Sequence, residues 1–326
     1  MKKSLLLFPL LTFQFILGQS PPDVRNLVFE GAGIRGIAYC GVVQELESKK
    51  MMGNIEKIGG TSSGAIVALT ISLGYTGKEL ENIISQTNFK RLNDGKFFFI
   101  GGLNRMNKYF GWYKGKKVSR WLEKIIKTKT GNEDITFEEM HQKGFKDLYI
   151  TGTCLNKQKA VVFSHETYPK MKVKDALRIS VSIPLYFEPL YIDSAGNVFQ
   201  RPKQKHNLDM MMDGGFLENF PIHIFDKTSA DQHTIGFRID HTAQIEKDKG
   251  DRTLAERPIT NLREYFGAFY GITMENLNRQ RLTPEDWQRT VSISDGDVQP
   301  RLRKLSKEEV ATLIENGRKA VQARFN

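Results

Sequence analysis

A serine held between small residues is the first feature of this sequence that could carry out chemistry. Ser62 lies between Gly60 and Gly64 in a G-T-S-S-G motif, after a short apolar run at 55–58 and before a helix-like run at 65–73. A serine on such a tight strand-to-helix turn exposes its hydroxyl, and the flanking glycines avoid a steric clash within the turn. The start of the helix also favours developing negative charge. The motif therefore predicts a serine nucleophile, with a turn that has no catalytic function as the alternative.

A glycine-rich turn at residues 31–36 is the second such feature. It follows an apolar run at 24–30 and precedes another helix-like run, and its residues are Gly31, Ala32, Gly33, Ile34, Arg35 and Gly36. Backbone N–H groups in such a loop point toward an anion, so the G-x-G-x-x-G spacing fits either a dinucleotide-binding loop or an oxyanion hole. Dinucleotide binding requires an acidic residue at the end of the next strand. Here that strand leads to Ser62 instead, which favours an oxyanion hole.

A carboxylate on another tight turn is the candidate base, since a serine nucleophile needs a proton acceptor. Asp213 follows the apolar run 208–212 and precedes Gly214 and Gly215. Partial shielding from water at a strand end would raise its pKa toward a useful range, although an aspartate that caps its own turn is the simpler alternative. The histidines lie in no recognisable catalytic setting, yet a serine–histidine pair stays open. They are His141, His165, His206, His223, His233 and His241.

The composition of the 326-residue chain is that of an ordinary globular protein. Hydrophobic residues make up 40% and charged residues 26%, which excludes a disordered chain, a collagen and a polytopic membrane protein. The net charge of +11 favours anionic partners, but basic residues are spread among acids, so we do not expect nucleic-acid binding. With two cysteines, the chain is neither a disulfide scaffold nor a Cys-rich zinc protein. Cys40 and Cys154 lie in apolar segments, which favours buried free thiols over a disulfide.

The first 18 residues are typical of a secretory signal peptide. Lys2 and Lys3 form a positive start, residues 5–17 form a short, mostly apolar stretch, and the small Gly18 suits a cleavage position. The stretch is short for a spanning helix, which needs about 20 residues. We therefore expect residues 1–18 to be removed and the mature protein to be exported, to a periplasm or beyond the cell.

The order of the apolar runs predicts the fold class. Strand, turn and helix follow one another twice over residues 24–73, which indicates an α/β sandwich with a largely parallel sheet. Residues 76–145 look mainly helical and basic, and the polar segment 240–258 is expected to be a mobile loop. Further strands are expected at 148–155, 160–163, 208–212 and 234–239, and further helices at 175–180, 259–281 and 307–325.

Taken together, the motifs resemble those of the patatin-like phospholipase family. That family has, in this order, a G-G-G-x-[RK]-G loop, a G-x-S-x-G turn and a D-G-[GA] turn. The matching residues here are Gly31–Gly36, Gly60–Gly64 and Asp213–Gly215. Residues 176–189 (ALRISVSIPLYFEP) are similar to the family's A-S-x-[AS]-x-P-x-x-F-x-P segment, and residues 305–323 look like the tail of bacterial members.

The resemblance implies an architecture as well as a site. The expected fold is a three-layer α/β/α sandwich with a largely parallel central sheet. The family domain would cover residues 27–226, and a C-terminal strand and helical extension, residues 227–326, would pack on the same domain. Arg35 would support the glycine-rich loop or meet lipid phosphate, and Pro184 and Pro189 would shape the floor of the site.

The resemblance also implies a catalytic pair of serine and aspartate that works without histidine, cofactor or metal. Ser62 would be the nucleophile that forms the acyl-enzyme, and Asp213 the general base. Backbone N–H groups around Ala32, Gly33 and Ile34 would form the oxyanion hole. Ala32 departs from the family pattern, which has glycine there, and this costs about 1 kcal/mol or more if the position needs a positive φ.

These roles predict a secreted serine lipid acyl hydrolase of the phospholipase A or lysophospholipase type. Its substrate would be a phospholipid or lysolipid, and its contact with membranes would be peripheral. The aromatic and lysine-rich segment 108–117 could lie at a lipid interface, although an ordinary solvated face explains it more simply. The alternatives are a lipid-binding, effector-like module with little turnover, and a nucleotide-binding enzyme that uses residues 31–36.

Overall fold

The structure of the chain is a computed structural model. It describes residues 23–95, 98–250, 253–256, 259–262, 264–265, 268, 279–298 and 305–326, with side chains omitted for 98–100. The predicted signal peptide at 1–18 lies outside these residues, as does most of the helix expected at 259–281.

A nine-stranded sheet forms the centre of the molecule, with the strand order β11-β10-β1-β2-β4-β9-β7-β8 and with β5 paired to β4. The neighbours from β11 to β4 run parallel, whereas β5, β9, β7 and β8 pair antiparallel. The largely parallel central sheet predicted from the sequence is therefore confirmed. The strands are β1 Asn26–Phe29, β2 Lys57–Gly60, β4 Asp147–Cys154, β5 Lys159–Phe163, β7 Leu190–Ile192, β8 Val198–Phe199, β9 Asp209–Asp213, β10 Thr234–Asp240 and β11 Thr290–Ser294.

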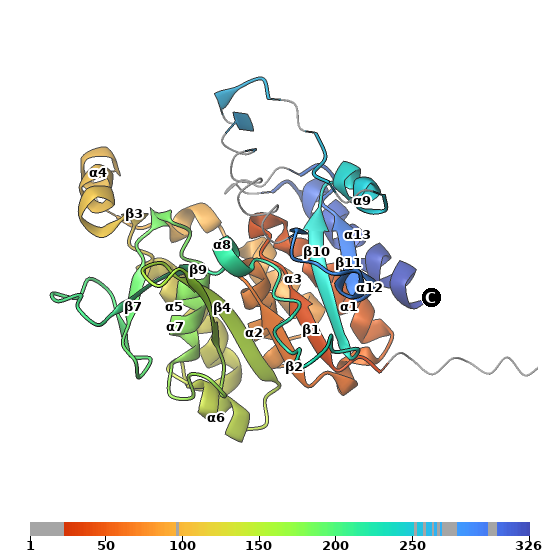
Figure 1. Cartoon of the computed structure of the whole chain (residues 1–326), viewed down its shortest axis with the longest axis horizontal. Coiled ribbons are helices and arrows are strands. Elements are labelled where there is room, and N and C mark those ends of the chain that lie inside the picture. The colour runs from red at the N-terminus through yellow and green to blue at the C-terminus, as the bar shows by residue number, and fades with distance from the viewer. Residues whose placement is uncertain are drawn as a thin grey trace, which may run out of the picture.

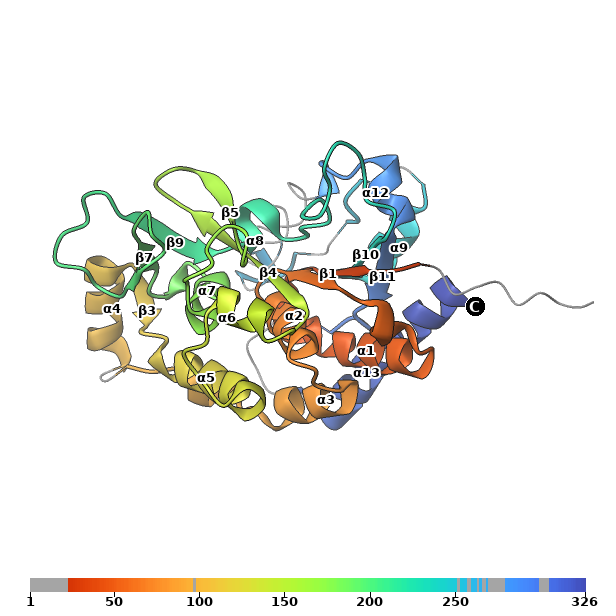
Figure 2. The same ribbon diagram turned by 90° about the horizontal axis from the view of Figure 1, so that it is seen from below.

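Helices cover both faces of this sheet, which makes three layers. Figure 2 shows α1, α2, α3, α5 and α13 on one face, with α8 and α12 on the other. The helices are α1 Ala38–Ser48, α2 Ser63–Ser72, α3 Gly77–Gln86, α4 Phe98–Tyr109, α5 Lys116–Thr130, α6 Phe137–Gln142, α7 Val173–Ser180, α8 Gly215–Glu218, α9 Thr242–Asp248, α12 Pro284–Gln288 and α13 Lys307–Phe325. Short 3₁₀ helices are η1 Gly33–Ile37, η2 Met51–Asn54 and η3 Phe89–Leu92.

The strands at the centre of the sheet are apolar on both faces because helices and loops cover both. All residues of β1 are buried, and Phe29 stacks on Phe237 of β10 with ring centres 5.4 Å apart. Helix α2 is buried on nearly every side, which fits its run of small and aliphatic residues. The buried thiols of Cys40 and Cys154 are free, as the sequence favoured.

The C-terminal helix α13 packs closely against α1, and the two lie side by side in Figures 1 and 2. Glycines make this approach possible. A Cβ on Gly41 would collide with the backbone of Ile314, and one on Gly317 would collide with the carbonyl oxygen of Ala38. The end of the chain is thus joined to the first helix after the glycine-rich turn.

The prediction of a mobile loop at 240–258 is wrong for the first part of that segment. Strand β10 continues to Asp240, and α9 follows directly. Asp240 is buried and forms ion pairs with Arg238 at 2.8 Å and Arg279 at 2.7 Å. Asp240 and Asp248, two of the charged residues that suggested a solvated loop, are therefore paired inside the protein, whereas Glu246 and Lys249 are exposed. The region 76–145 is mainly helical, as predicted, but also contains the short strand β3 (Gly111–Tyr113), which pairs with β6 (Leu185–Phe187).

Candidate active site

Ser62 occupies a strained turn between β2 and α2. Its φ of 52° and ψ of −117° lie outside the regions that an ordinary L-residue adopts. A Cβ on Gly60 would collide with the carbonyl oxygen of Gly64, and a Cβ on Gly64 would collide with that of Phe29. The two glycines of the motif are thus required by close backbone approach. This geometry is that of a nucleophile elbow, which holds a serine hydroxyl away from its own backbone.

Hydrogen bonds from neighbouring elements hold the turn in this shape. The Ser62 N–H donates to the hydroxyl of Ser180 at the end of α7, across 2.9 Å, and Ser180 is fully buried. The Thr61 hydroxyl donates to the carbonyl oxygen of Glu218 across 2.7 Å and lies 2.6 Å from the hydroxyl of Thr151. Ser180 lies in the segment 176–189 that resembles a family motif, but its hydrogen bond to Ser62, 118 positions earlier in the chain, was not predicted.

Asp213 lies at the end of β9. Strand β4 separates β9 from β2, the strand that leads to Ser62. The Asp213 carboxyl is buried, accepts a hydrogen bond from the Gly215 N–H across 2.8 Å, and interacts with the Ser62 side chain as a hydrogen-bond acceptor. Its own N–H donates to the Ser182 carbonyl oxygen across 3.0 Å. Desolvation raises the pKa of Asp213 to about 7, although the hydrogen bonds from Gly215 and Ser62 lower it in part. A carboxylate with this pKa can accept a proton at neutral pH.

Of the three backbone amides predicted for the oxyanion hole, two have no hydrogen-bond partner among the described residues. The Ala32 N–H donates to the Ser63 hydroxyl across 2.9 Å and is therefore occupied, which corrects its assignment as a donor. The N–H groups of Gly33 and Ile34 begin η1, and neither makes a hydrogen bond to another described residue. Both residues line the same pocket as Ser62. Their amides are thus available to a negatively charged oxygen.

The alanine in place of the family's glycine causes no backbone strain. Ala32 has a φ of −131°, whereas Gly33 has a φ of +56°. The position that needs glycine is therefore Gly33, and it has glycine. Arg35 is buried and forms an ion pair of 3.0 Å with Asp295, so of its two predicted roles the structure supports the loop and not the lipid phosphate.

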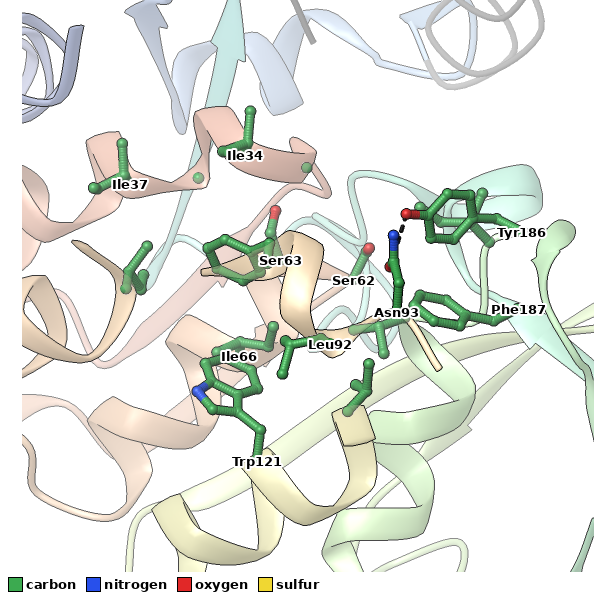
Figure 3. Close-up of a pocket in the computed structure, with 17 residues that line it drawn as sticks. Ile34, Ile37, Ser62, Ser63, Ile66, Leu92, Asn93, Trp121, Tyr186 and Phe187 are labelled. Atoms are coloured by element: carbon green, nitrogen blue, oxygen red, sulfur yellow. Dashed lines mark hydrogen bonds between the residues drawn. The ribbon is translucent and has the colours of Figure 1, made fainter. Parts of the chain in front are cut away.

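Ser62 opens into an apolar pocket that is continuous with solvent and has a cavity volume of about 120 Å³. Figure 3 shows the residues that line it. Its walls come from η1, α2, α3, η3, α5 and β6. The larger side chains among them are Ile34, Ile37, Ile66, Ile84, Phe89, Leu92, Val118, Trp121, Ile183, Tyr186 and Phe187. A polar contact closes one side, where the Tyr186 hydroxyl donates to Asn93 across 2.9 Å. Such a cavity suits a long apolar group attached to the atom that Ser62 would attack.

Most of the residues that line this pocket were not predicted from the sequence. Phe89 and Trp121 lie in the region described only as helical and basic, and their rings meet edge to face at 6.0 Å. The predicted floor residues Pro184 and Pro189 do not line the pocket, and their neighbours Ile183 and Phe187 do so instead. The prediction placed the right segment, residues 176–189, beside the site. Which of its residues face the pocket depends on the turn that leads into β6.

No histidine lines the Ser62 pocket, and all the histidines are among the described residues. Three groups of histidine and carboxylate side chains in the described part of the chain could hold a metal ion, but none adjoins Ser62. These are His141, Asp147 and His165; His223, Asp226 and Asp286; and His241, Asp295 and Asp297. Arg289 forms ion pairs with both carboxylates of the second group, and Arg35 forms one in the third. Among the described residues, Asp213 is thus the ionisable group that bonds the Ser62 side chain.

Comparison with known proteins identifies the family. The model of the patatin-like phospholipase family matches residues 27–226, and the chain belongs to this family. The chain is 29% identical over 205 residues to the probable lipid hydrolase 463L of Invertebrate iridescent virus 6, covering 63% of this chain and 64% of that protein. It is 28% identical over 308 residues to the uncharacterized protein YqhO of Bacillus subtilis, covering 90% and 96%. These relationships support lipid ester hydrolysis in general.

Solved structures share the fold. VipD from Legionella pneumophila aligns with a TM-score of 0.60 and 15% identity, over 93% of this chain and 67% of that one. A chain of the ExoU–SpcU heterodimeric complex from Pseudomonas aeruginosa aligns with a TM-score of 0.53 and 17% identity, over 94% and 52%. Within the described residues, no helix has both the length and the apolar character to cross a membrane.

Proposed function

We propose that the protein is a secreted serine lipid acyl hydrolase of the phospholipase A or lysophospholipase type. The observation that carries this proposal is the strained Ser62 turn, which opens into an apolar pocket beside the buried carboxyl of Asp213. Family membership adds a lipid ester as the class of substrate. The signal peptide expected at residues 1–18 supports export, and the N-terminal sequence of protein recovered outside the cytoplasm tests it.

The proposed reaction is acyl transfer in two steps. Asp213 accepts the proton of Ser62 as the serine oxygen attacks the ester carbonyl carbon, and the N–H groups of Gly33 and Ile34 bind the oxyanion that forms. Collapse of this intermediate breaks the ester bond, and Asp213 returns the proton to the leaving alcohol. Water then attacks the acyl-enzyme with Asp213 again as base, and Asp213 passes this proton to the Ser62 oxygen as the fatty acid leaves. The acyl chain occupies the apolar pocket throughout.

A fluorophosphonate probe tests the nucleophile directly. We expect one adduct, located by peptide mass spectrometry on Ser62, and its loss in Ser62→Ala. Fatty-acid release from phospholipid and lysolipid should disappear in both Ser62→Ala and Asp213→Asn. An adduct at another serine, or undiminished turnover in Ser62→Ala, would overturn the proposal. Wild-type protein that binds lipid without any turnover would favour the lipid-binding alternative instead.

A further inference from the structure

Large apolar side chains are exposed at the end of the molecule that carries α4, which projects from the body in Figures 1 and 2. Leu103 is 61% exposed, Phe110 is 43% exposed and Leu185 is 62% exposed. They belong to one region, because α4 packs on β3 and the pairing of β3 with β6 sets Gly111 opposite Leu185. Exposed apolar groups gathered in this way are uncommon on soluble proteins and mark sites of contact.

Two of these residues are held in strained backbone. Phe110 has a φ of 60° and Leu185 has a φ of 66°, a region that bulky residues rarely adopt. Strain of this kind persists only where the surrounding structure enforces it. The fold thus keeps two large apolar residues exposed at a cost in backbone energy, and neither is part of the core.

Two lysines, Lys108 and Lys205, lie near these apolar groups, in segments that contain no acidic residues. The sequence contains no Asp or Glu over residues 98–117 or 197–208. The Lys205 ammonium lies 5.1 Å from the centre of the Phe110 ring, and Lys108 is two residues before Phe110 in the sequence. Neither lysine has a carboxylate partner among the described residues. Glu188, which lies near this region, is buried and paired with Arg201.

The exposed region continues into the wall of the Ser62 pocket. Leu185 begins β6, and the next two residues, Tyr186 and Phe187, line the pocket. The Tyr113 ring of β3 contacts that of Tyr186, with centres 4.9 Å apart. A lipid drawn from a surface against Leu185 would therefore meet the pocket without first crossing open water.

We infer that this surface, defined by Leu103, Lys108, Phe110, Leu185 and Lys205 and called the α4 surface, docks on a bilayer that contains anionic phospholipid. The apolar side chains enter the acyl boundary, and the lysines lie at the level of the phosphates. The charge of the surface selects an anionic bilayer over a neutral one. This inference rests on the proposed function, because it names the membrane surface from which the hydrolase would take its lipid.

Vesicle flotation tests the charge of the surface. The mature chain carrying Ser62→Ala is mixed with vesicles of phosphatidylcholine alone, or of phosphatidylcholine and phosphatidylglycerol at about 3:1, so that binding is measured without turnover. We expect binding only to the anionic vesicles, and at least a tenfold loss in the double variant Lys108→Glu/Lys205→Glu. The matched control is Lys143→Glu/Lys170→Glu, which reverses the same charge at exposed lysines near α6.

A second variant tests the apolar contact. Leu103→Asp should lower anionic-vesicle binding by at least tenfold, because it removes an inserted side chain and adds a charge. Ala323→Asp, which adds the same charge at an exposed position of α13, should bind as the parent does. If either set of α4-surface variants binds like its control, or if the parent binds neutral vesicles equally well, the inference is wrong. A change in oligomeric state without a change in vesicle binding would also overturn it, in favour of a second copy of the chain.

Turnover of a water-soluble butyrate ester separates this inference from the proposed function. On the Ser62 background, all four variants should cleave the ester at the parent rate, because none of the changed residues lines the pocket. Failure of wild-type protein to cleave any ester would count against the proposed function alone, since the flotation experiment uses the Ser62→Ala protein. Normal ester cleavage with unchanged vesicle binding in the α4-surface variants would count against the docking surface alone.

Discussion

The N–H of Ser62 donates a hydrogen bond to the hydroxyl of Ser180 across 2.9 Å, and Ser180 is fully buried at the end of α7. This bond joins the strained turn between β2 and α2 to a helix from a distant part of the chain. Because the φ of Ser62 is 52°, the turn needs an external partner to keep its shape. Ser180 is thus a positioning residue for the proposed nucleophile.

Ser180→Ala should therefore reduce kcat more than it changes KM. The substitution leaves the buried Ser62 N–H without a partner, which costs about 1–3 kcal/mol of folding free energy. If the turn loses its shape in the transition state, a cost of the same size lowers kcat roughly 5- to 100-fold. Ester kinetics and thermal unfolding measure the two effects. The control is Ser72→Ala, which removes another buried hydroxyl of α2 that donates to the Lys146 carbonyl oxygen across 2.5 Å, at the far end of the helix. It should lose stability but retain kcat, and equal losses of kcat in both variants would contradict the positioning role.

The activity should rise with pH through about 7, because only the ionised Asp213 accepts a proton and its pKa is raised to about 7 by burial. Below that pH, kcat/KM for a soluble ester is expected to fall tenfold per unit. His223→Gln and His241→Gln serve as controls and should leave this pH dependence in place, because neither histidine lines the Ser62 pocket. A profile that stays flat down to pH 5, or a limb that vanishes with one histidine, would exclude Asp213 as the base.

The same carboxyl should make stability fall as pH rises. The folded state keeps the Asp213 proton up to a pH of about 7, whereas the unfolded chain loses it near the ordinary value of 3.8. The stabilising contribution is therefore complete below 3.8 and is lost as pH rises to about 7. Relative to Asp213→Asn, the free energy of unfolding of wild type should fall by on the order of 4 kcal/mol over this window. Urea unfolding of both proteins at several pH values measures it, and a constant difference would refute the raised pKa.

The close packing of α13 on α1 predicts a large effect of one methyl group. Gly317→Ala would place its Cβ against the Ala38 carbonyl oxygen, so we expect a loss of about 1–3 kcal/mol and a fall in Tm of several degrees. Alanine normally stabilises a helix relative to glycine, so the sign of the change identifies the clash. At Gly53 a Cβ would meet no atom within 4 Å, and Gly53→Ala should leave Tm unchanged. Equal stability of the two variants would show that α13 can move away from α1.

The sequence was sufficient for those parts of the fold and site that depend on local spacing. The turn around Ser62 and the turn after Asp213 each combine an apolar strand with glycines at fixed offsets, so both could be predicted. Features that depend on pairing between distant segments could not. The segment after Asp240 was expected to be a loop, because its ion pair with Arg279 could not be seen in the sequence. The Ala32 N–H was assigned to the oxyanion hole, because its hydrogen bond to Ser63 could not be seen either.

The pocket was not predicted for the same reason. Phe89, Trp121 and Tyr186 come from separate elements, and each looks like an ordinary half-buried residue in its own segment. Only their convergence on Ser62 makes them a binding site. Ile66 is the exception that local reasoning could have found, because it lies four residues after Ser62 on the same face of α2.

That position gives a direct test of which substrate group occupies the pocket. Ile66→Phe adds volume to the wall next to Ser62, so it should shorten the acyl chain that fits. We expect kcat/KM for p-nitrophenyl palmitate to fall at least tenfold relative to that for p-nitrophenyl butyrate. Ile66→Val, which keeps the shape and removes one methyl group, should leave the chain-length profile nearly unchanged. If Ile66→Phe lowers activity on both esters by the same factor, the acyl chain does not lie along α2, and the pocket receives another part of the lipid.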